Sequence, residues 1–222
     1  MKDAAALAAA GEPHGTVVVA EQQTAGIGRH GHCWRSDNTG GLYLSIILRI
    51  DTATPTLTMA LGLAVQRAVN DVAGVTTDLR WPNDVMLNER KLAGILVQSA
   101  DGALIAGIGV NVNQQAFPEE LRGIATSLRI ETGREYSKDA VLDRVTAESL
   151  RYSAVPKTEI LRRFEENSSY VRGKSVIVDD RISGMTAGLD GDGFLLLDTK
   201  DGPRTIFAGG IRPCNGNTII KH

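Results

Sequence analysis

Four short apolar segments follow one another closely in the middle of the chain and limit the folds that it can adopt. They cover residues 78–81, 85–87, 92–98 and 103–112, and turn-forming residues such as Asp101-Gly102 separate them. Short runs joined by such tight turns are typical of hairpin strands, because a parallel connection needs about a dozen residues or more. The sequence therefore predicts an antiparallel or mixed sheet.

Further strands and helices are expected on either side of this region. The runs at 16–20 and 42–50 predict two strands, and apolar residues at helical spacing predict helices over 4–10, 54–73, 138–151 and 159–166. Thr54 followed by Pro55, and Ser137, are typical helix starts. The expected fold class is therefore α+β.

After about residue 171 the sequence changes to short β-type runs separated by turn residues. Four short β-type runs, at 173–178, 184–189, 193–197 and 205–208, are separated by turns such as Asp190-Gly191-Asp192-Gly193. This pattern predicts a small β-barrel with too few residues to hold much core alone. We expect two units, residues 1–170 and residues 171–222.

Composition and charge exclude several classes of protein. The 222 residues carry a net charge of −2, which argues against a general nucleic-acid binder, and the two cysteines lack a metal-type spacing. No apolar run reaches the roughly 18 residues that a membrane helix needs, and residues 1–10 lack the pattern of a signal peptide. We expect a cytoplasmic protein that binds neither DNA nor a membrane.

A long polar loop over residues 22–41 holds the pattern Gly26-Ile27-Gly28-Arg29-His30-Gly31. A dinucleotide-binding fingerprint needs a strand directly before these glycines and a helix directly after them, and this context is absent from the sequence. Closely spaced backbone N–H groups, together with Arg29, His30 and His32, can instead bind an anion. A solvated loop without a ligand is the alternative that the loop alone leaves open.

Three more segments place polar residues or glycines at or near predicted strand ends. They are the turn 80–84, the strand start Arg90-Lys91, and the run 107–113 with its two glycines and Asn111. Lys91 could neutralise negative charge in a pocket, and Gly94 permits close approach of a ligand or another backbone. Each segment also has a plain structural alternative: a turn, a solvated strand end or an irregular edge strand. Together they indicate a sheet-walled pocket for a nucleotide and a small apolar ligand.

The order of these four motifs resembles the signature of the biotin–protein ligases. In chain order the motifs are Glu21–Gly31, Arg80–Asp84, Arg90–Leu96 and Gly107–Asn113. The region after residue 172 is similar to the SH3-like C-terminal domain of that family. The resemblance implies a mixed, mostly antiparallel sheet with helices on one side, related to that of class II synthetases, followed by the small barrel.

The resemblance also implies an ATP-dependent biotin–[acetyl-CoA-carboxylase] ligase that uses Mg²⁺. Biotin would be activated to biotinyl-adenylate and passed to a lysine of a biotin carboxyl carrier protein. The residues implied as catalytic are Lys91 and Arg29, and Asp84 is implied as a metal ligand. The implied biotin site comprises Gln23, Gly26, Ile27, Lys91, Gly94 and Leu96. The implied nucleotide site comprises Arg29, His30, His32, Trp34, Asn83 and Asn111.

The sequence departs from the family pattern in three places. Ile27 and His32 stand where arginines are usual, so we expect a less basic loop and weaker nucleotide binding. Residues 1–5 align where the family's Asp-Ser-Thr-Asn strand ends, so the first strand is expected to be missing. A lipoate–protein ligase, an inactive biotin or adenylate binder and a generic nucleotide-binding module stay open as alternatives. An open sheet edge makes a homodimer a further expectation.

Overall fold

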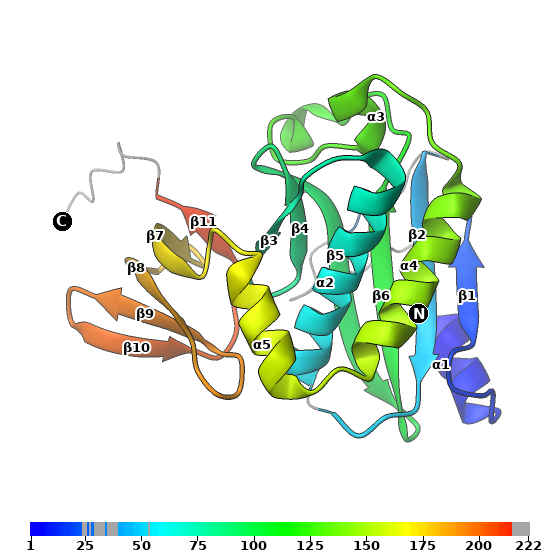
Figure 1. The fold of residues 1–222 in the computed structure, drawn as a ribbon, viewed down its shortest axis with the longest axis horizontal. Coiled ribbons are helices and arrows are strands. Elements are labelled where there is room, and N and C mark those ends of the chain that lie inside the picture. The colour runs from blue at the N-terminus through cyan, green and yellow to red at the C-terminus, as the bar shows by residue number, and fades with distance from the viewer. Residues whose placement is uncertain (24–25, 27, 29–33, 35–39, 53, 215–222) are drawn as a thin grey trace.

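Two sheets organise the chain in the computed structural model, which describes residues 1–23, 26, 28, 34, 40–52 and 54–214 (Figure 1). The first sheet has the strand order β1-β2-β6-β5-β4-β3. Its strands are β1 (Val17–Ala20), β2 (Gly41–Leu48), β3 (Asp78–Arg80), β4 (Asp84–Leu87), β5 (Arg90–Ala100) and β6 (Ala103–Asn111). All neighbouring strands pair antiparallel. This pairing confirms the prediction drawn from the tight turns.

The second sheet follows in the sequence and lies beside α5 (Lys157–Glu166) (Figure 1). Its strand order is β10-β9-β8-β7-β11, again antiparallel throughout. The strands are β7 (Arg172–Val178), β8 (Ile182–Leu189), β9 (Leu195–Thr199), β10 (Gly202–Ile206) and β11 (Ile211–Pro213). We call β7–β11 the C-terminal sheet, and it is consistent with the predicted SH3-like unit.

Helices pack against both faces of the six-stranded sheet. α2 (Thr54–Ala73) and α4 (Lys138–Ser153) lie together on one face, and α1 (Lys2–Ala9) lies behind the other (Figure 1). The alternation of side chains along β2 explains this arrangement. Ile46 and Leu48 join the core with α2, whereas Ile47 packs in a separate cluster with Ala4 and Ala8 of α1. The helices were expected on one side of the sheet, so α1 is an exception to that expectation.

One hydrophobic core joins the two sheets. Its buried members include Leu79 of β3, Phe164 of α5, and Val176 and Leu195 of the C-terminal sheet. A small sheet that shares its core with a larger neighbour gains apolar burial that its own residues cannot supply. The boundary near residue 170 stays a prediction, and the two units are not separate in their packing.

Three short elements were not predicted: the 3₁₀ turn η2 (Glu119–Leu121), the helix α3 (Leu128–Thr132) and β11. α3 is too short to show a helical period, although Ser127 caps its start and Gly133 ends it at φ +70°. The strand predicted over 205–208 is instead β10, at Gly202–Ile206. Its Gly202-Pro203 start is typical of a turn, but β10 is an edge strand, where proline is tolerated.

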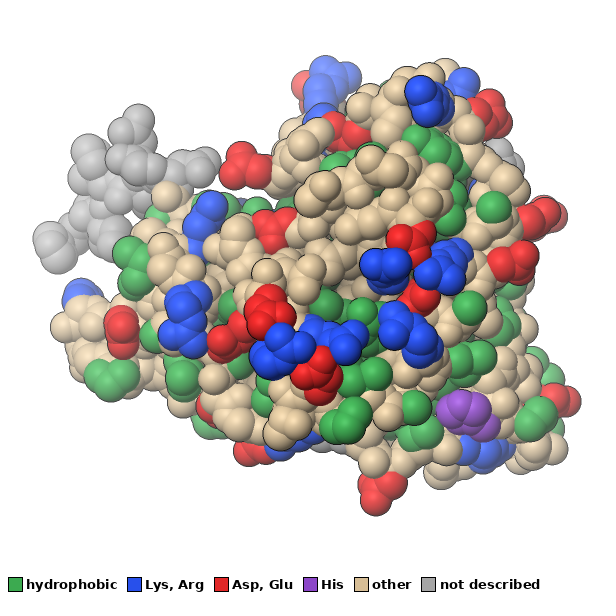
Figure 2. Space-filling view, viewed as in Figure 1, with side chains coloured by type: hydrophobic (Ala, Val, Ile, Leu, Met, Phe, Trp, Pro, Cys, Tyr) green, Lys and Arg blue, Asp and Glu red, His purple; other side chains and the backbone are tan. Residues whose placement is uncertain are grey.

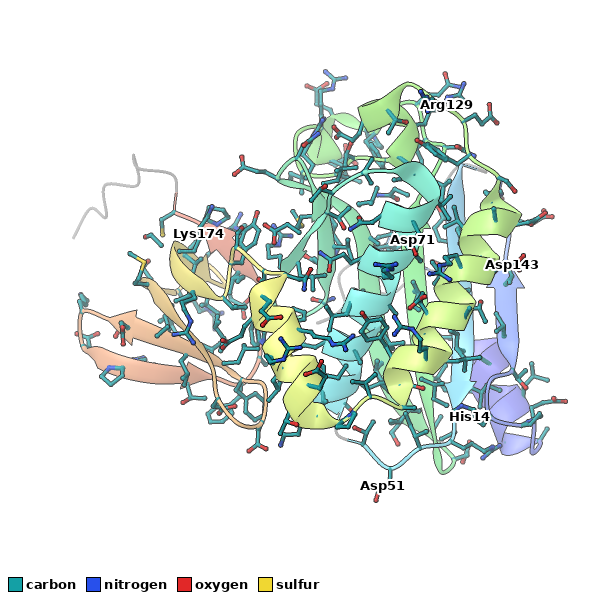
Figure 3. The ribbon with its side chains drawn as sticks, in the orientation of Figure 1. His14, Asp51, Asp71, Arg129, Asp143 and Lys174 are labelled. Carbon is teal, nitrogen blue, oxygen red and sulfur yellow. The ribbon has the colours of Figure 1, made fainter. Side chains whose placement is uncertain are left out.

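Charged side chains of both signs are interspersed on the face formed by α2, α4 and α5 (Figure 2). Asp71 of α2 points toward α4 (Figure 3), and its Oδ2 accepts a hydrogen bond from Arg144 Nη2 at 2.6 Å. This hydrogen bond is the main reason that the pKa of Asp71 lies below its ordinary value. None of the described helices has both the length and the apolar character that crossing a membrane requires.

Candidate active site

A cavity of about 840 Å³ lies on the face of the six-stranded sheet that is turned away from α2. Residues 94–96 of β5 and residues 107–109 of β6, which pair with each other, form its floor. Its walls come from β4, from Trp34 and from two segments of the C-terminal sheet. The volume falls in the range of several hundred Å³ that is usual for sites of small organic ligands.

Two glycines on the floor make room for an aromatic wall. Gly94 of β5 and Gly109 of β6 are cross-strand partners. A Cβ atom at Gly94 would lie 2.9 Å from Cζ3 of Trp34, and one at Gly109 would lie 2.8 Å from its Cε2. Any larger residue at either position would therefore displace the indole. The close approach predicted at Gly94 is made here by the Trp34 ring.

Lys91 reaches into the same cavity, where acidic and aromatic groups hold its side chain. Its Nζ lies 2.5 Å from Oδ1 of Asp84 and 5.3 Å from the centre of the Trp34 ring. The second oxygen of Asp84, Oδ2, accepts a hydrogen bond from Arg80 Nη2 at 2.7 Å. Burial alone would raise the pKa of Asp84, but the positive charges of Lys91 and Arg80 hold that pKa below its ordinary value. The carboxylate is therefore charged and shared between two cations.

The backbone of Lys91 is also fixed, because a chain segment runs alongside it. Lys91 N–H donates to the carbonyl of Ile124 at 2.8 Å, and Thr126 N–H donates to the carbonyl of Lys91 at 2.9 Å. The side-chain amide of Asn111 reaches the same Lys91 carbonyl at 3.4 Å. Hydrogen bonds at both backbone groups and an ion pair at the ammonium leave this lysine little freedom.

The structure brings most of the described site residues together. Seven of those predicted from the sequence line this one cavity: Gln23, Trp34, Asn83, Asp84, Lys91, Gly94 and Leu96. Gly26 lies next to it, since its carbonyl accepts a hydrogen bond from Trp34 N–H at 2.9 Å. Asn111 does not line it but is buried beneath, with Oδ1 bonded to Gln114 Nε2 at 3.0 Å. The predictions for Ile27, Arg29, His30 and His32 lie outside the described residues.

The predicted metal ligand, Asp84, is held by other groups of the chain in this structure. Both of its carboxylate oxygens face cations of the chain itself. Across residues 1–23, 26, 28, 34, 40–52 and 54–214, no group of three His, Cys, Asp or Glu residues is arranged to hold a metal ion. Mg²⁺ that accompanies a nucleotide takes most of its oxygen ligands from phosphates and water and needs only one or two carboxylates, so the role of Asp84 stays a prediction.

Sequence reasoning missed the contribution of the C-terminal sheet to this cavity. Residues 179–181, at the turn between β7 and β8, and residues 210–212, at β11, line the wall. Arg212 forms an ion pair with Asp180, and Gly210 N–H donates to Oδ1 of Asp179 at 2.7 Å. No local signal could have found them, because only the fold brings this turn next to residues 80–96. Ile124, Arg80 and Met1 also line the cavity and had been given no role.

A cavity of ligand size with a fixed lysine on its floor is suited to binding a small anionic molecule, and comparison with known proteins identifies the family. Residues 6–115 match the model of the biotin/lipoate A/B protein ligase family. The chain is 36% identical to the bifunctional ligase/repressor BirA of Bacillus subtilis, over 95% of this chain and 70% of that protein. The chain therefore belongs to the biotin/lipoate A/B protein ligase family.

Two further relatives point to one branch of this family. The biotin–[acetyl-CoA-carboxylase] ligase of Mycobacterium tuberculosis is 42% identical, over 51% of this chain and 45% of that one. Among solved structures, the biotin protein ligase of Aquifex aeolicus in complex with biotin and ATP superposes with a TM-score of 0.80. That comparison has 33% identity and covers 91% of each chain.

Proposed function

We propose that this chain is a biotin–protein ligase that activates biotin with ATP and attaches it to a lysine of a biotin carboxyl carrier protein. The observation that carries the proposal is the placement of Lys91, whose ammonium lies at the floor of a cavity of ligand size between Asp84 and the Trp34 ring. A fixed cation in a partly apolar site is what the joining of two anions needs. The named relatives support biotin as the acid and ATP as its activator.

In the first step, an oxygen of the biotin carboxylate attacks the α-phosphorus of ATP, and pyrophosphate leaves with the electron pair of the broken P–O bond. Carboxylate and phosphate repel each other, so a positive charge between them lowers the barrier. An ammonium has three N–H donors. Lys91 can therefore keep its ion pair with Asp84 and still donate to the approaching oxygens.

In the second step, the neutral amine of the carrier lysine attacks the acyl carbon and loses one proton to solvent, and AMP leaves with the bridging oxygen. Water also attacks the mixed anhydride and is far more abundant than the carrier amine, so the site has to keep water out between the two steps. The Trp34 ring, the wall of the C-terminal sheet and, in our proposal, Arg29 serve this purpose.

We assign the remaining residues to the two halves of the cavity. Gln23, Gly26 and Ile27 would hydrogen-bond the ureido ring of biotin, and Gly94 and Leu96 would face its apolar side. Arg29, His30, His32, Trp34 and Asn83 would bind the adenylate. Asn111 would act on the nucleotide side of the cavity, close to the backbone of Lys91, whose carbonyl it contacts. Mg²⁺ is proposed to accompany ATP, and no step above depends on a protein ligand for it.

The test is the intact mass of a purified biotin carrier domain after incubation with this chain, biotin, ATP and Mg²⁺. We expect a gain of one biotin that requires ATP. A parallel incubation with lipoate distinguishes the two branches of the family, because a lipoate ligase would add lipoate instead. Binding of biotin without any gain in carrier mass would refute the proposal in favour of an inactive binder.

A further inference from the structure

The cavity and the C-terminal sheet are joined by one buried hydrogen bond. Trp81 lines the cavity and is 3% exposed. Its indole Nε1 donates to the carbonyl oxygen of Gly193 at 3.0 Å, across 112 residues of sequence. Gly193 lies in the turn between β8 and β9. The wall of the cavity is therefore attached to the C-terminal sheet through this turn.

The turn fits its place closely. Gly193 has φ +86°, and a Cβ atom on it would collide with the terminal methyl of Met59 and lie 3.1 Å from Leu161 Cδ2. The backbone conformation thus favours glycine, and any Cβ atom here would have to displace the Met59 methyl. Oδ1 of Asp190 accepts the N–H groups of Asp192 and Phe194, each at 2.9 Å, and so shapes the turn. The turn presents the Gly193 carbonyl to Trp81 in one defined position.

The same sheet also forms part of the cavity wall, at the other end of β8. Residues 179–181 come just before β8 and line the cavity, whereas Gly193 comes after it. An eight-residue strand spans roughly 25 Å. A small rotation of the sheet about the Gly193 contact would therefore move residues 179–181 by a larger distance. Loss of the contact would loosen the wall far from the turn itself.

We propose that the Trp81–Gly193 hydrogen bond is a positioning contact that holds the C-terminal sheet against the cavity and thereby keeps the acyl-adenylate away from water. This inference rests on the proposed function. With the contact intact, the carrier amine attacks the acyl carbon and AMP leaves. With the contact broken, water attacks the same carbon, and biotin and AMP are released together with the two protons of that water, without transfer.

The test compares Gly193→Ala with Gly191→Ala, a matched control in the same turn, where a Cβ atom meets no atom within 4 Å. The measured quantity is the amount of biotinylated carrier per pyrophosphate formed. Pyrophosphate reports activation, and the ratio reports retention of the adenylate. We expect Gly193→Ala to lower the ratio roughly fivefold, in line with the loss of one hydrogen bond, and Gly191→Ala to leave it unchanged.

A second variant and a spectroscopic measurement separate this role from a merely structural one. Trp81→Phe keeps an aromatic ring but removes the donor, so it should lower the same ratio even if Gly193→Ala does not fold. The chain has two tryptophans, and Trp34→Phe assigns their two indole N–H signals in a ¹⁵N spectrum. The Trp81 signal should exchange slowly with solvent in the wild type and quickly in Gly193→Ala.

The outcomes are distinguishable. An unchanged ratio in Trp81→Phe, or a fast-exchanging Trp81 N–H in the wild type, would overturn the inference while leaving the proposed function intact. Absence of biotin-dependent pyrophosphate formation in the wild type would overturn the proposed function itself.

Discussion

At the scale of single residues, the site depends on how Lys91 is held. Its side chain is bound by Asp84 and its backbone by Ile124 and Thr126. Such fixed charges stabilise a transition state well, since no reorganisation is needed when the substrates react. The ammonium and its supports therefore act as one unit.

Replacing Lys91 by methionine tests this unit directly. Lys91→Met keeps most of the chain length but removes the charge, so we expect biotin-dependent pyrophosphate formation to fall roughly 10²- to 10³-fold. The control is Lys200→Met, because Lys200 is exposed at the turn between β9 and β10. Near-normal pyrophosphate formation in Lys91→Met would remove the lysine from the chemistry.

The sequence indicated many of these site residues but not the contacts between their side chains. Lys91, Gly94 and Asn83 could be singled out because motifs and residue types mark them. The pairing of Asp84 with Lys91 could not be predicted, since it depends on an irregular register between Val85 and Met86 that brings the two side chains together. For the same reason the two cationic partners of Asp84 could not be foreseen, and its predicted role as a metal ligand stays a prediction.

At the scale of elements, helix boundaries followed from local chemistry where the elements are long. Ser137 caps α4 as predicted, with its side chain accepting from Ala140 N–H. Short elements were harder to predict, because α3 and β11 have too few residues to show a hydrophobic period. α1 was placed correctly in the sequence, but only the alternation along β2 decides which face it covers.

The helix α5 gives a pH-dependent prediction. Side-chain hydrogen bonds from Arg162 and then Arg163 lower the pKa of Glu159 to about 2 from its ordinary 4.5. A lowered folded-state pKa means that the stabilisation is complete above about pH 4.5 and is lost as pH falls toward about 2. Glu159→Gln should therefore unfold in less urea than the wild type at neutral pH, and this difference should shrink on acidification.

Glu12→Gln serves as the control for that experiment, because Glu12 is exposed in the loop after α1. Its urea midpoint should track the wild type at each pH. A Glu159→Gln difference that stayed constant down to pH about 2 would contradict the assigned cause.

At the scale of the whole molecule, the two sheets share one core. Leu79 and Phe164 belong to the same buried cluster as Val176 and Leu195. The change to short β-type runs near residue 171 was visible in the sequence. The packing of the two sheets against each other was not, since contacts between distant segments leave no local pattern. The same holds for the cavity wall at residues 179–181.

Continuity of the core predicts a single thermal transition. Neither sheet can unfold without exposing apolar surface of the other, so the chain should unfold cooperatively. Calorimetry should give a calorimetric enthalpy close to the van't Hoff enthalpy. Two resolved transitions would instead show that residues 171–222 melt as an independent unit.

The floor and the wall of the cavity also differ in when they are made. Lys91, Gly94 and Gly109 all belong to one hairpin, β5 and β6, joined by the turn at Asp101-Gly102. The wall at residues 179–181 follows about seventy residues later in synthesis. On the ribosome, the hairpin that carries the reactive residues therefore emerges before the residues of its enclosure. Under our proposal, only completion of the C-terminal sheet makes the product of one step the substrate of the next.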